Sequence, residues 1–380
     1  MVEHQLPKLR VASSNLVSRS KKNQISARDV ARTSLVFLTC IVALLSSVLG
    51  GCIPARKNEA SSPGSFTEYT LGNSIYGGAE IVRGGAQLWV NNAVSSGDLV
   101  RLDTNGNYAL TWAPKEALTF IRGIAVASGN KIWLTVASGY LSGTHDRIVG
   151  IAQNGFVKEY RVPTYPAGVG GITIGSDKAL WFTEHDANKI GRMTQQGKFS
   201  EFQIRPINKK RPILDSLVGL DAVTLGPDGA VWFTENRANK IGRISRTGMV
   251  REFPLGPASG PEYIVAGPDH ALWFTEQADY IGRITPSGSI REFEVPTRGA
   301  GTWKITVGQD RNLWFTEVSA NKIARITPSG RVTEFSTPGR GPAAITAGPD
   351  GNIWFTESKA EHTGLVGEWG AVCRFLTPRT

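Results

Sequence analysis

The sequence predicts an all-β protein, a seven-bladed β-propeller of four-stranded antiparallel blades, and three observations support this prediction. The first is a tetrad, Trp-Phe-Thr-Glu, that recurs along the chain. Its five clear copies begin at Trp181, Trp232, Trp273, Trp314 and Trp354, and two weaker copies begin at Trp89 and Trp133. The second is the spacing of these Trp residues, with steps of 44, 48, 51, 41, 41 and 40 residues, which is typical of propellers and solenoids. The third is that each unit contains four short apolar runs separated by turns, with no helical periodicity.

The fifth unit shows the four expected strands most plainly. They cover residues 263–267, 271–276, 280–285 and 290–295, and Pro, Asp, Ser and Gly mark the turns between them. Seven such units close a ring and leave no long sheet edge exposed. A parallel β-helix is the alternative, but its coils are shorter and do not need four strands per repeat.

The tetrad itself has a structural explanation. Side chains alternate along a strand, so Trp and Thr face one side of the blade while Phe and Glu face the other. Both sides of a blade are covered by neighbouring blades, and we therefore expect Trp and Phe to pack between them. For the repeated Glu we expect a structural hydrogen bond that is satisfied in the same way in every blade.

The N-terminal segment has the sequence features of an export signal. Seven Lys and Arg residues precede an apolar run at 35–49, and the run ends in Leu49-Gly50-Gly51-Cys52. This ending resembles the lipobox of bacterial lipoproteins, in which the Cys is acylated. We expect residues 1–52 to be a lipoprotein-type signal peptide with Cys52 as the lipidation site, residues 53–65 to be a flexible tether, and residues 66–380 to be the propeller. An uncleaved membrane anchor is the alternative.

Charge and cysteine content exclude some function classes. The formal net charge is +10, but about half of it lies in the leader, and the remaining Arg residues recur as part of the repeat. No basic patch interleaved with aromatic residues is present, so we expect no nucleic-acid partner. Three Cys residues cannot build a disulfide framework,. We expect a monomer in the bacterial cell envelope, held to the membrane by its lipid and facing out of the cytoplasm.

The sequence offers two segments for the fourth strand of the last blade, where the ring closes. Residues 66–71 match the fourth strand of other units although they precede the first unit, so they can complete the last blade. Residues 371–376 can also serve as the fourth strand of that blade. Either the closing blade carries an extra strand or one of these segments is frayed.

A ligand site is expected where loops converge around the axis. The residue eleven positions before each Trp lies just ahead of the expected innermost strand, and this slot breaks the repeat. From the first unit to the seventh the slot residues are Ala79, Arg122, Gly170, Asp221, Glu262, Trp303 and Ala343, where Ala79 stands ten positions before its Trp because the first unit is one residue shorter. With their neighbours, the expected ligand-binding residues are Arg122, Asp221, Glu262, Tyr263, Trp303 and Lys304. Ordinary loop variation is the alternative.

The repeat also resembles that of a known family. The segment from Gly226 to Phe253, with its Gly-Pro-Asp-Gly turn, Trp-Phe-Thr-Glu tetrad and Asn-Lys-Ile-Gly-Arg-Ile strand, is similar to the repeat of virginiamycin B lyases, the streptogramin lyases. The resemblance covers about residues 66–378. It implies a seven-bladed propeller that opens streptogramin B depsipeptides by elimination at the ester bond with Mg²⁺. It also implies a His in the slot of the last two blades and Glu residues around the metal.

Those implied residues are not present at the matching positions. The two His slots hold Trp303 and Ala343, the Glu two residues before the second slot is Gly341, and the further metal Glu falls near Ser358. A relocated base is one hypothesis. Its candidates are His185, and His362 beside Glu361, with solvated loop His residues as the alternative. The candidate metal ligands are Asp221 and Glu262, which suit a divalent ion that keeps water ligands.

Two functions therefore remain open. The first is a lipid-anchored, extracytoplasmic propeller that binds a small molecule, glycan or protein on its axial face without chemistry. The second is a carbon–oxygen lyase of the virginiamycin B lyase type, which would imply Mg²⁺ and antibiotic resistance. No cofactor is certain from the sequence.

Overall fold

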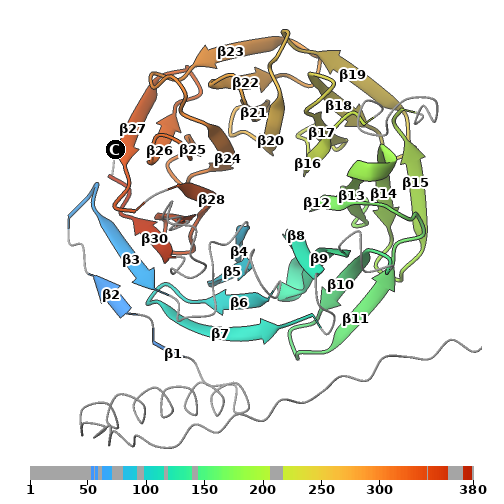
Figure 1. The fold of residues 1–380 in the computed structure, drawn as a ribbon, viewed down its shortest axis with the longest axis horizontal. Helices are drawn as coiled ribbons and strands as arrows, with labels where there is room; N and C mark the ends of the chain where they lie inside the picture. Colours follow the sequence, from blue (N-terminus) through green and yellow to red (C-terminus); the bar gives the residue numbers. More distant parts are fainter. Residues whose placement is uncertain are drawn as a thin grey trace, which may run out of the picture. The chain divides into compact units, whose positions relative to one another are not determined.

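The computed structural model describes 53–54, 56–58, 62–70, 80–91, 98–114, 119–138, 144–205, 217–339, 341–357 and 371–378. All of them belong to one compact unit, residues 50–380. Seven antiparallel sheets are arranged around a central axis (Figure 1). The fold is a seven-bladed β-propeller, as predicted. In this part of the chain no helix is both long and apolar enough to cross a membrane.

Blades one to three follow the chain from the inside outward. Blade one contains β4 (Ile81–Gly84), β5 (Gln87–Asn91), β6 (Leu99–Leu102) and β7 (Asn107–Trp112). Blade two contains β8 (Thr119–Val126), β9 (Ile132–Ser138), β10 (Arg147–Ile151) and β11 (Val157–Arg161). Blade three contains β12 (Val169–Ile174), β13 (Leu180–Glu184), β14 (Lys189–Met193) and β15 (Phe199–Gln203). Short 3-10 turns, η1 (Ser128–Asn130) and η2 (His185–Ala187), lie in two of the connections.

Blades four to six repeat the same order. Blade four contains β16 (Leu220–Leu225), β17 (Val231–Glu235), β18 (Lys240–Ile244) and β19 (Val250–Pro254). Blade five contains β20 (Pro261–Ala266), β21 (Leu272–Glu276), β22 (Tyr280–Ile284) and β23 (Ile290–Glu294). Blade six contains β24 (Thr302–Val307), β25 (Leu313–Glu317), β26 (Lys322–Ile326) and β27 (Val332–Ser336).

Blade seven joins the two ends of the chain. Its inner strands are β28 (Pro342–Ala347) and β29 (Ile353–Glu357), followed by β30 (Ala371–Phe375) and then β3 (Phe66–Thr70) from the N-terminal end. The segment 371–375 is therefore the third strand of this blade, not the fourth, because β3 takes the fourth position. In the sequence, Val-Cys-Arg-Phe of β30 matches the third-strand pattern Ile-Gly-Arg-Ile of other blades. Side chains agree with this assignment, since Tyr69 stacks on Trp354 at 5.2 Å as a fourth-strand Phe does on Trp in other blades.

Two further short strands lie on outer edges. β1 (Ile53–Pro54) pairs with β7 of blade one, and β2 (Arg56–Asn58) pairs with β3 of blade seven. Five residues of the segment expected as a flexible tether are thus strand residues. The predicted export signal, including Cys52, lies outside the described residues.

The core consists of clusters between neighbouring blades. Trp181 of blade three packs with Phe233 of blade four, and Trp232 packs with Phe274 of blade five, with every one of these rings 0–1% exposed. The same pairing continues around the ring, and Trp354 of blade seven meets Leu88 and Val90 of blade one. This confirms that Trp and Phe of the tetrad fill opposite faces of each blade.

The indole of each clear tetrad is also held by a polar contact. Trp232 Nε1 donates to Asp228 Oδ1 at 3.0 Å, and Arg243 Nε donates to the other oxygen of that carboxylate at 2.7 Å. Blades three and five have the same arrangement around Asp177 and Asp269. The Arg of the third strand is therefore part of the scaffold, as the sequence predicted.

The repeated Glu departs from expectation. Glu184, Glu235 and Glu317 are fully buried, and none of their carboxylate oxygens has a hydrogen-bond partner among the described residues. Glu276 accepts a hydrogen bond from the Ser259 hydroxyl, and Glu357 accepts one from the backbone N–H of Gly339 at 3.1 Å. The prediction of one common hydrogen bond in all blades is wrong, because the loop residue that could donate differs from blade to blade.

Candidate functional site

The slot residues that the structure describes lie inside the innermost strands, not ahead of them, whereas Ala79 lies outside the described residues. Asp221, Glu262 and Trp303 are each the second residue of the first strand of their blade. In each of these strands the pairing register shifts at this point, between Leu220 and Val223 in blade four for example. A β-bulge releases one residue from the ladder and redirects its side chain. The bulge explains why this position can vary, while the strand residues from Val223, Ile264 and Ile305 onward pair regularly and follow the repeat.

The Thr of the tetrad fixes the backbone at the bulge. Thr234 Oγ1 accepts a hydrogen bond from the N–H of Ala222 at 3.0 Å and donates to the carbonyl of Glu262 in the next blade at 2.9 Å. Equivalent hydroxyls donate to the slot carbonyls of Gly170, Asp221, Trp303 and Ala343. Blades two to six therefore each position the slot residue of the blade that follows.

A second set of residues follows the slots, one residue after each. These residues are Glu80, Gly123, Gly171, Ala222, Tyr263, Lys304 and Ala344. Most of them are small, and Gly171 leaves no room for a larger side chain because an added Cβ would stand 3.0 Å from the Asp221 carbonyl. The three long side chains can therefore meet in the middle.

Lys304 connects this second set. Its ammonium forms an ion pair with Glu80, although blade seven lies between blades six and one, and it stands 3.7 Å from the ring centroid of Tyr263. Lys304 is only 6% exposed. Burial lowers its pKa and raises that of the Tyr263 hydroxyl well above its usual value. Lys304 thus acts as a cross-link at the axis, and its side chain is not freely available to a ligand.

Two carboxylates stand beside this cross-link. Glu262 is 3% exposed, and the amides of Asn236 and Gln277 both donate to its Oε1. Burial raises the pKa of Glu262, and the nearby charge of Asp221 raises it further. Burial also raises the pKa of Asp221, against the opposing charges of His185, Lys304 and Arg122. The carboxylate of Asp221 takes no hydrogen bond from any described residue.

The remaining slot residues give the site its shape. Trp303 is 37% exposed and meets Tyr263 in a T-shaped contact with ring centroids 5.4 Å apart. Arg122 is exposed, with its guanidinium 5.7 Å from the Phe120 ring centroid. All six predicted ligand-binding residues lie on the innermost strands β8, β16, β20 and β24, which surround the axis (Figure 1).

Of the candidate bases, only His185 can be placed. It lies in η2, between the second and third strands of blade three, and its Nδ1 is 2.9 Å from Asp186 Oδ1. Its charge, when present, acts on Asp221. Glu361 and His362 lie outside the described residues. Among the described residues no group of three or more His, Cys, Asp and Glu side chains is arranged to hold a metal ion.

Sequence analysis missed Glu80, Asn236 and Gln277. Glu80 had a detectable signal, because it follows the first slot as Tyr263 and Lys304 follow theirs. No sequence signal marked the amide residues. Asn236 and Gln277 stand directly after the Glu of their tetrads, in loops that vary between blades. Only the fold brings them to Glu262.

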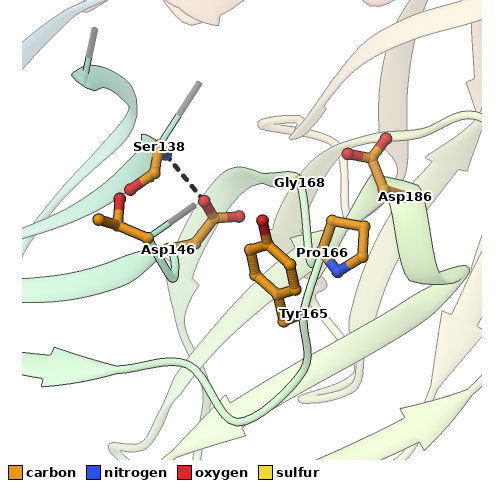
Figure 2. Close-up of a pocket in the computed structure, with 7 residues that line it drawn as sticks. Ser138, Asp146, Tyr165, Pro166, Gly168 and Asp186 are labelled. Atoms are coloured by element: carbon orange, nitrogen blue, oxygen red, sulfur yellow. Dashed lines mark hydrogen bonds between the residues drawn. The ribbon is translucent and has the colours of Figure 1, made fainter. Parts of the chain in front are cut away.

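The structure encloses a small pocket elsewhere, between blades two and three (Figure 2). It has a volume of about 30 Å³ and is lined by Ser138, Thr144, Asp146, Tyr165, Pro166, Gly168 and Asp186. Asp146 accepts hydrogen bonds from the backbone N–H of Ser138 at 2.8 Å and of Val169 at 2.9 Å. The carboxylate is thus satisfied by the scaffold, and the pocket has room for about one water molecule. We do not assign the function to it.

Known proteins resemble this chain over almost all of the propeller. A streptogramin B lyase structure is 31% identical with a TM-score of 0.69, and the match covers 82% of this chain and 99% of that one. A catalytically inactive variant of virginiamycin B lyase from Staphylococcus aureus, solved with quinupristin, is 32% identical with a TM-score of 0.68, covering 82% of this chain and 99% of that one. The virginiamycin B lyase of Nocardia farcinica is 29% identical over 209 residues, which span 53% of this chain and 64% of that protein.

A sequence profile extends the match to both halves of the ring. The profile of the virginiamycin B lyase family matches residues 56–214 and 207–380. The two stretches together include the weak first units as well as the clear later ones. With its seven-bladed fold and this match, the chain belongs to the virginiamycin B lyase family.

Proposed function

We propose that this protein is a lipid-anchored, extracytoplasmic propeller that binds a small molecule, glycan or protein at the axial ends of β16, β20 and β24. The observation that carries this proposal is that the two slots where the family resemblance implies His hold other residues. Trp303 and Ala343 occupy those slots. An exposed indole offers a large contact surface, whereas neither residue can transfer a proton.

Binding is tested by a thermal-shift screen of a metabolite library, followed by titration of each hit. Trp303→Ala should weaken a ligand of the axial site by at least about tenfold, or 1.4 kcal/mol. Met249→Ala is the control, because Met249 is 74% exposed at the outer rim beside β19. Hits whose affinity is the same in wild type, Trp303→Ala and Glu262→Gln would argue against an axial binding site.

Membrane anchoring is a separate part of the proposal and has its own test. Cys52→Ala should shift the protein from the membrane fraction to an unprocessed or soluble form, because stable anchoring needs the acyl chains. Cys40→Ala is the matched control, since Cys40 lies within the apolar run that precedes the lipobox. Unchanged processing and membrane binding of Cys52→Ala would contradict the lipoprotein assignment.

A lyase is the second candidate function, and the position of His185 favours it. Asp186 accepts or shares a hydrogen bond with Nδ1 of His185 at 2.9 Å, which leaves Nε2 to act as a base,. In such an elimination the base takes a proton from the carbon next to the ester-bearing carbon, a C=C bond forms, and the C–O bond breaks to release a carboxylate. The described residues form no group of three that would hold a metal ion.

Incubation with a streptogramin B and Mg²⁺, followed by chromatography and mass spectrometry, distinguishes the two candidates. Elimination leaves the mass unchanged but alters the retention time, so both are measured. A lyase should convert the substrate and lose this activity in His185→Asn. Unchanged retention after prolonged incubation with wild type would leave the binding function as the proposal.

A further inference from the structure

The axis already contains one ammonium-binding arrangement, and it comes from the chain itself. The ammonium of Lys304 lies over the face of Tyr263 and pairs with the carboxylate of Glu80. An aromatic face and a carboxylate together are the usual protein environment for a cationic amine. The buried Lys304 therefore shows which kind of charge the centre of this ring accommodates.

A second combination of the same kind stands next to it, in contact with solvent. Trp303 is the most exposed of the described Trp residues, at 37%, and it packs edge-to-face against Tyr263. Glu262 and Asp221 occupy the slots of the two preceding blades, and the charge of each acts on the pKa of Tyr263. Aromatic surface and carboxylates thus occur together for a second time, without a cation from a described residue bound to them.

Each of these carboxylates has at least one oxygen that receives no hydrogen bond from a described residue. Glu262 is 97% buried, yet both of its amide donors use Oε1, and no described residue donates to Oε2. Asp221 receives no hydrogen bond from a described residue. Buried carboxylates are normally paired or hydrogen-bonded, because an isolated buried charge is costly. The two side chains would gain most from a ligand that brings a positive charge with N–H donors.

Lys304, Arg122 and His185 act on Asp221 through their charge, but none of them donates a hydrogen bond to either carboxylate. Lys304 is already paired with Glu80. Arg122 is exposed and solvated, and it forms no ion pair with a described residue. His185 directs Nδ1 to Asp186. The carboxylates of Asp221 and Glu262 therefore remain without a hydrogen-bonded cation, and their negative charge favours a positively charged ligand over a neutral or negative one.

Resting on the proposed binding function, we infer that the axial site takes an organic cation: a protonated amine attached to an aromatic or other apolar group. The ammonium lies between Asp221 and Glu262, and the apolar group lies against the indole of Trp303. Burial raises the pKa of both carboxylates, and a bound cation would lower it again because the positive charge stabilises their charged forms,.

Three probes of similar size and different charge test the inference: phenethylamine, 2-phenylethanol and 3-phenylpropionate. Binding is followed by the indole N–H signals in ¹⁵N–¹H NMR, and the signal of Trp303 is identified by its loss in Trp303→Phe. The indoles of Trp232 and Trp273 donate to Asp residues of the scaffold and serve as internal controls. We expect phenethylamine to shift the Trp303 signal saturably, with a Kd of about 1 mM or lower.

Two variants separate charge from shape. Glu262→Gln keeps an oxygen that can accept from Asn236 and Gln277, so the loop contacts remain, but it removes the charge. It should weaken phenethylamine by at least about tenfold, as should Asp221→Asn. Glu294→Gln is the matched control, because Glu294 is exposed on the outer strand β23 and its loss should leave the affinity unchanged.

Equal binding of 2-phenylethanol or 3-phenylpropionate would overturn the inference, and so would the absence of any saturable shift with phenethylamine. Neither result removes the proposed function. A neutral or anionic hit from the library screen that loses affinity in Trp303→Ala would keep the axial site while excluding a cation as its ligand.

Discussion

Trp273 and Trp303 show how the surroundings of one residue type decide its role. Trp273 is fully buried between blades five and six, whereas Trp303 stands partly exposed at the axis. Removal of a buried aromatic ring leaves a cavity and loses its contacts. Trp273→Ala should therefore lower the free energy of unfolding by about 3–5 kcal/mol. Trp303→Ala should lower it by less than about 1 kcal/mol, because the exposed ring loses little buried contact.

Urea unfolding of both variants checks this prediction. Similar destabilisation by the two substitutions would mean that Trp303 supports the ring instead of lining a site.

Lys304 calls for a different expectation from the other slot neighbours. The sequence suggested a ligand-binding residue, but the side chain is buried and paired with Glu80. Lys304→Met should destabilise the protein by about 3–5 kcal/mol, because it leaves the carboxylate of Glu80 without its partner. The double variant Lys304→Met, Glu80→Gln should recover most of that loss.

The comparison of unfolding free energies for the single and double variants measures this coupling. A double variant no more stable than Lys304→Met would contradict an ion pair that matters at the axis.

The sequence located the axial residues because they interrupt a strict repeat. Asp221, Glu262 and Trp303 differ from one another at a position where scaffold residues agree, and the bulge in each innermost strand explains the difference. The contact between Lys304 and Glu80 could not be predicted, since 224 residues separate them and an alignment of units does not show which side chains cross the axis. Asn236 and Gln277 were missed for a related reason, because loop residues acquire their partners only in the folded ring.

At the level of elements, strand β3 holds the closing blade together. Tyr69 stacks on Trp354 with ring centroids 5.2 Å apart and an interplanar angle of 17°. Tyr69→Ala should destabilise blade seven by about 3–5 kcal/mol. The effect should appear first as faster amide exchange in β30, which β3 covers on one side,.

Phe293→Ala is the matched control for this experiment. Phe293 stacks on Trp273 in blade five at 5.5 Å and 13°, and its loss should accelerate exchange in β22 while β30 stays protected. Equal acceleration in both blades for both variants would indicate that the ring opens as one unit, not blade by blade.

The order of strands in blade seven was only partly predictable. Residues 66–71 were recognised as a fourth strand by their likeness to other units, and that assignment is confirmed. Residues 371–375 were placed one strand too far out, because the long stretch between β29 and β30 hides the third-strand pattern. Strands β1 and β2 have no counterpart in the repeat, so the repeat could not predict them.

At the level of the whole molecule, the repeated Glu residues make stability depend on pH. Burial raises the pKa of Glu184 and Glu235 from 4.5 to about 8, and the nearby charges of Glu201 and Glu252 add to this. Burial likewise raises the pKa of Glu276 and Glu317 to about 7. Between pH 4.5 and 8 the folded state therefore holds protons that the unfolded chain has released. Their contribution is fully present below pH 4.5 and is lost as pH rises through this window.

Glu184→Gln isolates one of these contributions. Relative to wild type, its free energy of unfolding should improve with rising pH, at most by about 1.4 kcal/mol per unit between about pH 5 and about pH 8. Lys189 and Asp146 also act on Glu184, in opposite directions, and both stay in place in this variant. Urea unfolding at several pH values gives the comparison, with Glu294→Gln as the exposed control. A pH-independent difference would mean that Glu184 is ionised in the folded protein.

The pairing of β3 with β30 also has a consequence for the order of events during synthesis. Thr70 and its partner Ala371 are separated by about 300 residues, which a ribosome adds in about 15–60 s at 5–20 residues per second. For that time the N-terminal strand has emerged while its partner does not yet exist. The edge that will close the ring must therefore be kept from pairing with other chains until the last blade is made. Delayed closure of this kind is compatible with the export that we propose for this chain.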